Sequence, residues 1–205
     1  SFGIIYLDAY SERVNKELAA NIIRLHVLAN SDSDEDQALK LKVRDRVIRY
    51  MEDKLKKSKD INESRQILLE NLGNIKKLVL DEIEKNGYDY DARVTFGNYA
   101  FPTRKYGDLS LPAGMYDALR ITIGKGEGQN WWCVLFPPLC FVDVTHGEMS
   151  ASAREKLKNS LDGEEYNIVV SADSEEDIPI VIKFKIVELF QDSKIKIAGL
   201  VKQNN

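Results

Sequence analysis

The sequence predicts an α+β fold in which a mainly antiparallel sheet of about four strands carries two or more helices on one face. Two long stretches repeat apolar residues at helical spacing, and several short runs are rich in branched and aromatic residues. The chain has 205 residues, of which 43% are hydrophobic and 30% charged. This size and composition suit one globular domain with a substantial core.

The first predicted helix covers residues 34–57. Its apolar residues recur at every fourth position, as expected for one buried helical face: Leu39, Val43, Val47, Met51 and Leu55. Ser33 or Asp34 is the expected N-cap, and the acidic residues that follow favour the positive end of the helix dipole.

A second long helix is predicted over residues 62–86. Gly87 should end it in a left-handed conformation, and Gly73 suggests a break into two shorter helices. Short polar helices are expected over residues 9–21 and 150–161.

Four strands are predicted near residues 22–29, 91–97, 117–124 and 130–136. The last two are separated by a glycine-rich stretch, residues 124–129, which predicts a long hairpin with a flexible tip. A phosphate-binding loop is disfavoured, because the Gly-Lys-Ser/Thr ending is missing and a strand follows where nucleotide folds need a helix.

We expect three parts: an N-terminal helical lead segment over residues 1–21, an α+β domain over residues 22–145, and a C-terminal extension over residues 146–205 that packs on the same domain. Within the extension, the apolar run 178–190 first alternates and then fits a helix better. The pattern leaves strand and helix open there.

Composition argues against several functions. The net charge of −4 disfavours a nucleic-acid partner, because phosphate binding needs a basic face. No apolar run approaches the roughly 18 residues of a membrane span. Because the chain begins with Ser and lacks an initial Met, we expect that a signal or membrane anchor can precede it.

Residues 130–142 contain both tryptophans and both cysteines of the chain. Adjacent strand residues face opposite sides, so Trp131 and Trp132 cannot both be buried on one face, and one is available to a partner. Pro137 and Pro138 should end the strand in a turn. Cys133 and Cys140 then flank the turn, and spacing alone leaves a disulfide and two buried thiols equally open.

No metal or cofactor is expected. The acidic run 30–36 imitates the start of a calcium loop, but Gln37 and Val43 stand where a glycine and a bidentate Glu are needed. A zinc site would need His26 and His146 together with both cysteines, without the usual paired-ligand spacing.

Residues 130–142 leave two functional hypotheses open. Cys133 with His26 could act as a hydrolytic pair, although an apolar segment raises a thiol pKa. The tryptophans could instead stack on the sugars of a cell-wall glycan.

Four stretches of the chain resemble the stage II sporulation protein R family, and together they span most of residues 20–145. They are IRLHVLANSDS (23–33), EDQALKLKVRD (35–45), YGDLSLPAG (106–114) and GEGQNWWCVLFPPLCF (126–141).

The resemblance implies an exported signalling protein, made in the forespore of an endospore-forming bacterium. In the space between the forespore and mother-cell membranes, it would trigger a membrane-embedded aspartic protease of the mother cell to remove the inhibitory pro-sequence of sigma-E. Such a protein is an activator and not itself an enzyme. Export also favours a disulfide between Cys133 and Cys140, because that space lies outside the cytosol.

We therefore expect a partner-binding surface built from the loop 30–37, the tip 106–114 and the hairpin 130–140. The candidate residues are His26, Asn30, Asp32, Tyr106, Asn130, Trp131, Trp132 and Pro137.

Overall fold

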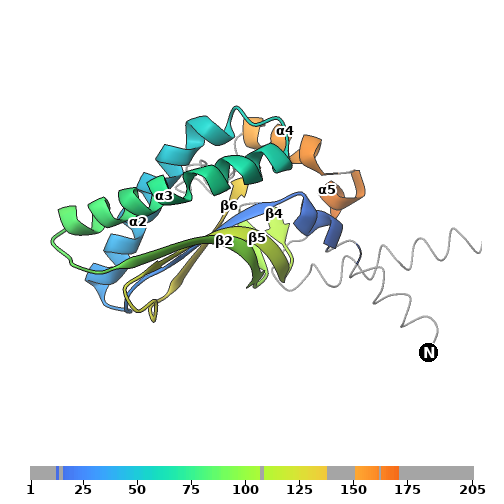
Figure 1. Cartoon of the computed structure of the whole chain (residues 1–205). Coiled ribbons are helices and arrows are strands. Elements are labelled where there is room, and N and C mark those ends of the chain that lie inside the picture. Colours follow the sequence, from blue (N-terminus) through green and yellow to red (C-terminus); the bar gives the residue numbers. More distant parts are fainter. Residues whose placement is uncertain (1–12, 14–15, 107–108, 138–150, 162, 171–205) are drawn as a thin grey trace, which may run out of the picture.

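A computed structural model describes residues 13, 16–106, 109–137, 151–161 and 163–170. Two long helices lie on one face of a four-stranded sheet, and a second, two-stranded sheet and two short helices lie near one end (Figure 1). The predicted α+β class is confirmed. In chain order the elements are β1 (Ile23–Leu28), α2 (Asp34–Leu55), α3 (Ile61–Lys85), β2 (Ala92–Phe101), β3 (Arg104–Tyr106), β4 (Leu109–Leu111), β5 (Gly114–Ile123), β6 (Asn130–Phe136), α4 (Ala151–Ser160) and α5 (Gly163–Val170).

The strand order in the large sheet is β2-β5-β1-β6. β1 runs parallel to β5, whereas the β1–β6 and β2–β5 pairs are antiparallel. All six residues of β1 are buried, which is typical of a central strand covered on both faces.

The predicted hairpin of residues 117–124 and 130–136 is wrong. β1 lies between β5 and β6, so residues 124–129 cross the end of β1. These residues also pack against the loop after β1, because a Cβ added at Gly128 would lie 2.1 Å from the carbonyl oxygen of Ser31. Close backbone approach of this kind is possible only for glycine.

The start of α2 and the end of α3 agree with the sequence prediction. Ser33 caps α2, and its side chain accepts a hydrogen bond from the backbone of Asp36. After α3, Gly87 adopts the predicted positive φ of 84°. The break suggested at Gly73 is wrong: α3 is continuous, because a single glycine costs only about 1 kcal/mol and buried residues such as Leu68 and Ile75 hold the helix on the sheet.

Apolar side chains form a core on each face of the large sheet. The main core lies between the sheet and the helices α2 and α3. The second core covers only part of the far face, where Leu18 and residues of β4, α4 and α5 pack against Phe101 and Tyr116. The elements β3, β4 and α5 were not predicted from the sequence, whereas α4 matches the helix expected over residues 150–161.

Several predictions fall wholly or partly outside the described residues. Residues 16–20 are helical, as expected for the lead segment. The run 178–190 and Cys140 lie outside the described part of the chain, and the division into three parts stays a prediction. Within the described ranges, no helix has the length and apolar character needed to cross a membrane.

Candidate partner-binding surface

The two tryptophans lie on opposite faces of β6, as strand alternation predicts. Trp131 packs at the margin of the main core, where the guanidinium of Arg44 lies 4.1 Å from its ring centroid. Trp132 faces the other way and is half-buried. Its ring stacks on His26 at 3.7 Å between centroids and meets the edge of Phe101 at 4.7 Å. Only Trp132 is therefore part of the far face of the sheet.

His26 is a buried, neutral member of this aromatic cluster. Its side chain is 5% exposed, and Nε2 lies 2.7 Å from Oδ1 of Asn130. The pKa of His26 is lowered to about 4, mainly by burial; the hydrogen bond with Asn130 raises the pKa, and the positive charge of Arg120 lowers it. The imidazole thus contributes no charge to this face at neutral pH.

The acidic run after β1 has a structural role at the start of α2. The carboxylate of Asp36 is buried and accepts hydrogen bonds from Asn30 Nδ2 at 2.8 Å and from Ser31 Oγ at 2.6 Å. Burial raises the pKa of Asp36, but these hydrogen bonds outweigh burial, and the pKa is lower than usual. Asp36 is therefore an ionised anchor for the loop 30–37.

The loop 30–37 also holds the connection between β5 and β6. Asp32 Oδ1 accepts a hydrogen bond from the backbone of Gln129 at 2.7 Å, and Asn30 Oδ1 accepts one from the backbone of Lys125 at 3.0 Å. Lys40 is only 4% exposed and donates to the carbonyl oxygen of Gln129 at 3.0 Å. Sequence reasoning missed Lys40, because lysines between apolar helix positions are usually solvated.

Tyr106 lies at the opposite end of the sheet, against a fully buried arginine. Arg24 Nη2 donates to the Tyr106 hydroxyl at 2.8 Å, and Arg24 Nε donates to the carbonyl oxygen of Cys133 at 3.2 Å. The guanidinium also lies 4.5 Å and 4.9 Å from the ring centroids of Phe101 and Tyr116. This packing is a cation–π arrangement within the second core. The only sequence signal for it is that Arg24 alternates with His26 on one face of β1.

Tyr116 completes this end of the second core. Its hydroxyl donates to the carbonyl oxygen of Pro112 at 2.7 Å, and burial raises its pKa to about 12, so it stays protonated. Pro137, which ends β6 as predicted, is also buried.

The candidate residues therefore do not form one cluster. The structure brings His26, Asn30, Asp32, Asn130 and Trp132 together at one end of the sheet. It places Trp131 on the helix-covered face, and it places Tyr106 and Pro137 at the opposite end.

The hydrolytic pair considered from the sequence is not formed. Cys133 is paired with Leu25 across the β1–β6 ladder and points into the main core, whereas His26 points to the far face. The imidazole of His26 therefore cannot act as the base for a thiol at Cys133. In the described part of the chain, no three His, Cys, Asp or Glu side chains are grouped as metal ligands.

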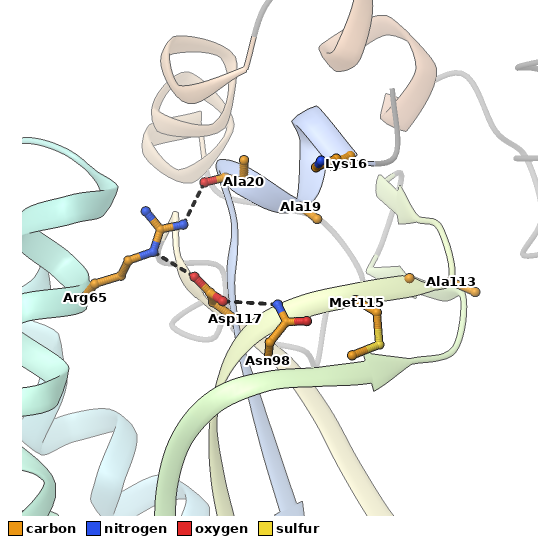
Figure 2. A pocket seen from close by; sticks show the side chains of 9 residues that line it. Lys16, Ala19, Ala20, Arg65, Asn98, Ala113, Met115 and Asp117 are labelled. Carbon is orange, nitrogen blue, oxygen red and sulfur yellow. Dashed lines mark hydrogen bonds and ion pairs between the residues drawn. The ribbon is translucent and has the colours of Figure 1, made fainter. Parts of the chain in front are cut away.

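A pocket of about 470 Å³ lies where the helical residues 16–20 meet α3 and the β2–β5 pair (Figure 2). Arg65 Nε donates to Asp117 Oδ2 at 2.8 Å, and Asn98 donates to the other carboxylate oxygen at 3.2 Å. Arg65 also donates to the carbonyl oxygen of Ala20 at 3.0 Å. These charges are thus satisfied internally, and they tie residues 16–20 to the sheet.

Comparison with known proteins places the chain in a family. The family model described as stage II sporulation protein R matches residues 19–146, which include the whole large sheet, α2 and α3. The chain belongs to the stage II sporulation protein R family. Stage II sporulation protein R of Bacillus subtilis (strain 168) is 38% identical over 179 residues, which cover 83% of this chain and 80% of that protein. No solved structure matches the chain.

Proposed function

We propose that this sporulation protein is an exported signal that activates a membrane-embedded aspartic protease, which then processes pro-sigma-E. The observation that carries the proposal is membership of the stage II sporulation protein R family, whose model covers residues 19–146. The protein acts in the space between the forespore and mother-cell membranes, and it performs no catalysis itself.

Activation requires that the chain binds the active state of the protease more tightly than the inactive state, because a partner shifts an equilibrium only through differential affinity. A rigid surface suits this task, since less conformational entropy is lost on binding. The interlocked loops 30–37 and 124–130 support the proposal, because backbone and side-chain hydrogen bonds hold them in one arrangement.

We also propose that Cys133 and Cys140 form a disulfide in the exported protein. The bond would close a small loop that begins at Cys133 in β6, and it is compatible with the oxidising conditions outside the cytosol.

Co-expression in a bacterium that does not sporulate tests the function. The host carries the protease and pro-sigma-E, together with this chain either fused to an export signal or kept in the cytosol. We expect cleavage of pro-sigma-E only with the exported chain. Equal cleavage without the chain, or with the cytosolic chain, contradicts the proposal.

A further inference from the structure

Among the described residues, no helix or loop covers one end of the far face of the large sheet, which we call its open end. The strand register aligns one residue from each strand across this face: Thr95, Arg120, His26 and Trp132. α2 and α3 cover the opposite face, and α4 and α5 lie toward the other end of the sheet (Figure 1). Arg93, Tyr99 and Trp132 are exposed or half-buried at this end.

Arg120 has no carboxylate partner among the described residues. Its guanidinium lies 5.3 Å from the ring centroid of Tyr99, and its inaccessible Nε has no hydrogen-bond acceptor there. By contrast, three half-buried arginines on the helix side each pair with an acid: Arg44, Arg46 and Arg65. Because Arg120 as a whole is only half-buried and forms no ion pair with the described residues, its guanidinium can donate to an anion that comes from outside.

Arg93 supplies a second positive charge beside Arg120. Thr95 is directly opposite Arg120 across the β2–β5 ladder. Arg93 is two residues before Thr95 and is therefore the diagonal neighbour of Arg120 on the same face. The Cβ atoms of Arg93 and Arg120 are expected to be roughly 7 Å apart. Arg93 is exposed and forms no ion pair within the described ranges. Two guanidinium groups at this spacing can each bind a carboxylate of one extended peptide.

The charge of this face is opposite to that of the whole chain. The protein carries a net charge of −4, yet the described residues whose side chains lie at this end of the face include two arginines, Arg93 and Arg120, a neutral His26 and no acid. Two arginines are too few to track a nucleic-acid backbone against a net negative charge. The half-buried rings of Tyr99 and Trp132 add the aromatic surface that is enriched in protein interfaces.

We propose that this open sheet face, formed by Arg93, Thr95, Tyr99, Arg120 and Trp132, binds an acidic peptide segment of a partner protein. Carboxylates of the segment bind the two arginines, and an apolar side chain between them packs on the aromatic rings. The partner's identity rests on the proposed function, in which the segment belongs to the exposed part of the protease.

Charge reversal tests the face with a matched control. The test variant combines Arg93→Glu with Arg120→Glu. The control combines Lys57→Glu with Lys77→Glu, which makes the same change in net charge at exposed positions of the helix layer. Because Arg120 is half-buried, Arg93→Glu alone is a second test variant that changes only an exposed side chain.

Two readouts separate this inference from the proposed function. The first is binding of the purified chains to a copolymer of Glu and Tyr, compared with the anionic glycan heparin. We expect the wild type and the control to bind the copolymer, the double test variant to bind at least tenfold more weakly, and Arg93→Glu to show an intermediate loss. Equal binding by all variants, or arginine-dependent binding of heparin alone, overturns the acidic-peptide proposal.

The second readout is cleavage of pro-sigma-E with each exported variant. We expect the control to activate fully and the double test variant at least tenfold less. Full activation by the double test variant overturns the open face as the docking site and leaves the proposed function intact. Failure of the wild type to activate, with arginine-dependent binding of the copolymer, overturns the proposed function and leaves the face intact.

Discussion

Replacing Gly128 by alanine tests whether the connection between β5 and β6 is packed against the loop after β1. The new Cβ would lie 2.1 Å from the carbonyl oxygen of Ser31 and 2.9 Å from the Cβ of Ala29. The nearest atoms belong to the backbone, so the clash cannot be relieved by a side-chain rotation. The connection must therefore move away from the loop 30–37.

The expected loss of stability follows from the contacts that this movement breaks. Overpacking costs about 1–3 kcal/mol. The displaced segment also carries hydrogen bonds from Gly128 to Ala29 at 3.0 Å and from Gln129 to Asp32 at 2.7 Å, each contributing about 1 kcal/mol. We expect Gly128→Ala to lower the free energy of unfolding by about 3–5 kcal/mol.

Gly73→Ala is the matched control, because a Cβ added at Gly73 has no atom within 4 Å. In the middle of α3 this change should raise the free energy of unfolding by about 0.5–1 kcal/mol. Urea unfolding, monitored by tryptophan fluorescence, measures both variants. If Gly128→Ala stays within about 0.5 kcal/mol of the wild type, below the roughly 1 kcal/mol of a single hydrogen bond, the packed connection is refuted.

Three further predictions concern buried groups. Because the pKa of His26 falls from 6.5 to about 4 on folding, the unfolded chain binds more protons between these values. Stability should therefore decrease as pH falls from 6.5 to 4, by up to about 3 kcal/mol, and His26→Gln should flatten this urea-unfolding profile; a variant profile as steep as that of the wild type would refute the shift. Arg24→Ala should lower the free energy of unfolding in urea by about 3 kcal/mol. Arg24→Met should lower it much less, since methionine fills the space between the rings without a buried charge. Equal losses for the two variants would contradict this. The intact mass of exported protein should be two hydrogen atoms lower before reduction than after it, and two free thiols before reduction would exclude the bond between Cys133 and Cys140.

Local structure was largely predictable from the sequence. Residues with helical spacing, a capping Ser33 and a terminal Gly87 defined the two long helices, because caps and periodicity act within a few residues. The opposite orientation of Trp131 and Trp132 followed from strand alternation alone.

The order of the strands was not predictable in the same way. Sequence neighbours with a glycine-rich connection usually form a hairpin, but β1 is inserted between β5 and β6 and is buried along its whole length. The short elements β3, β4 and α5 have too few residues to show a clear periodicity.

The open sheet face was missed for a related reason. Arg93 and Arg120 are far apart in the sequence and become neighbours only through the β2–β5 register. Arg24 was missed because a buried guanidinium surrounded by aromatic rings depends on side chains from four separate elements.

The most direct test of the proposed activation is the cleavage rate of pro-sigma-E in membrane vesicles that contain the protease. Purified chain is added to one side of the vesicle membrane at a time. Addition to the extracytoplasmic side should raise the rate until it saturates, and addition to the cytosolic side should have no effect. A rate that is the same with and without the chain would contradict the central claim that this protein activates the protease by binding.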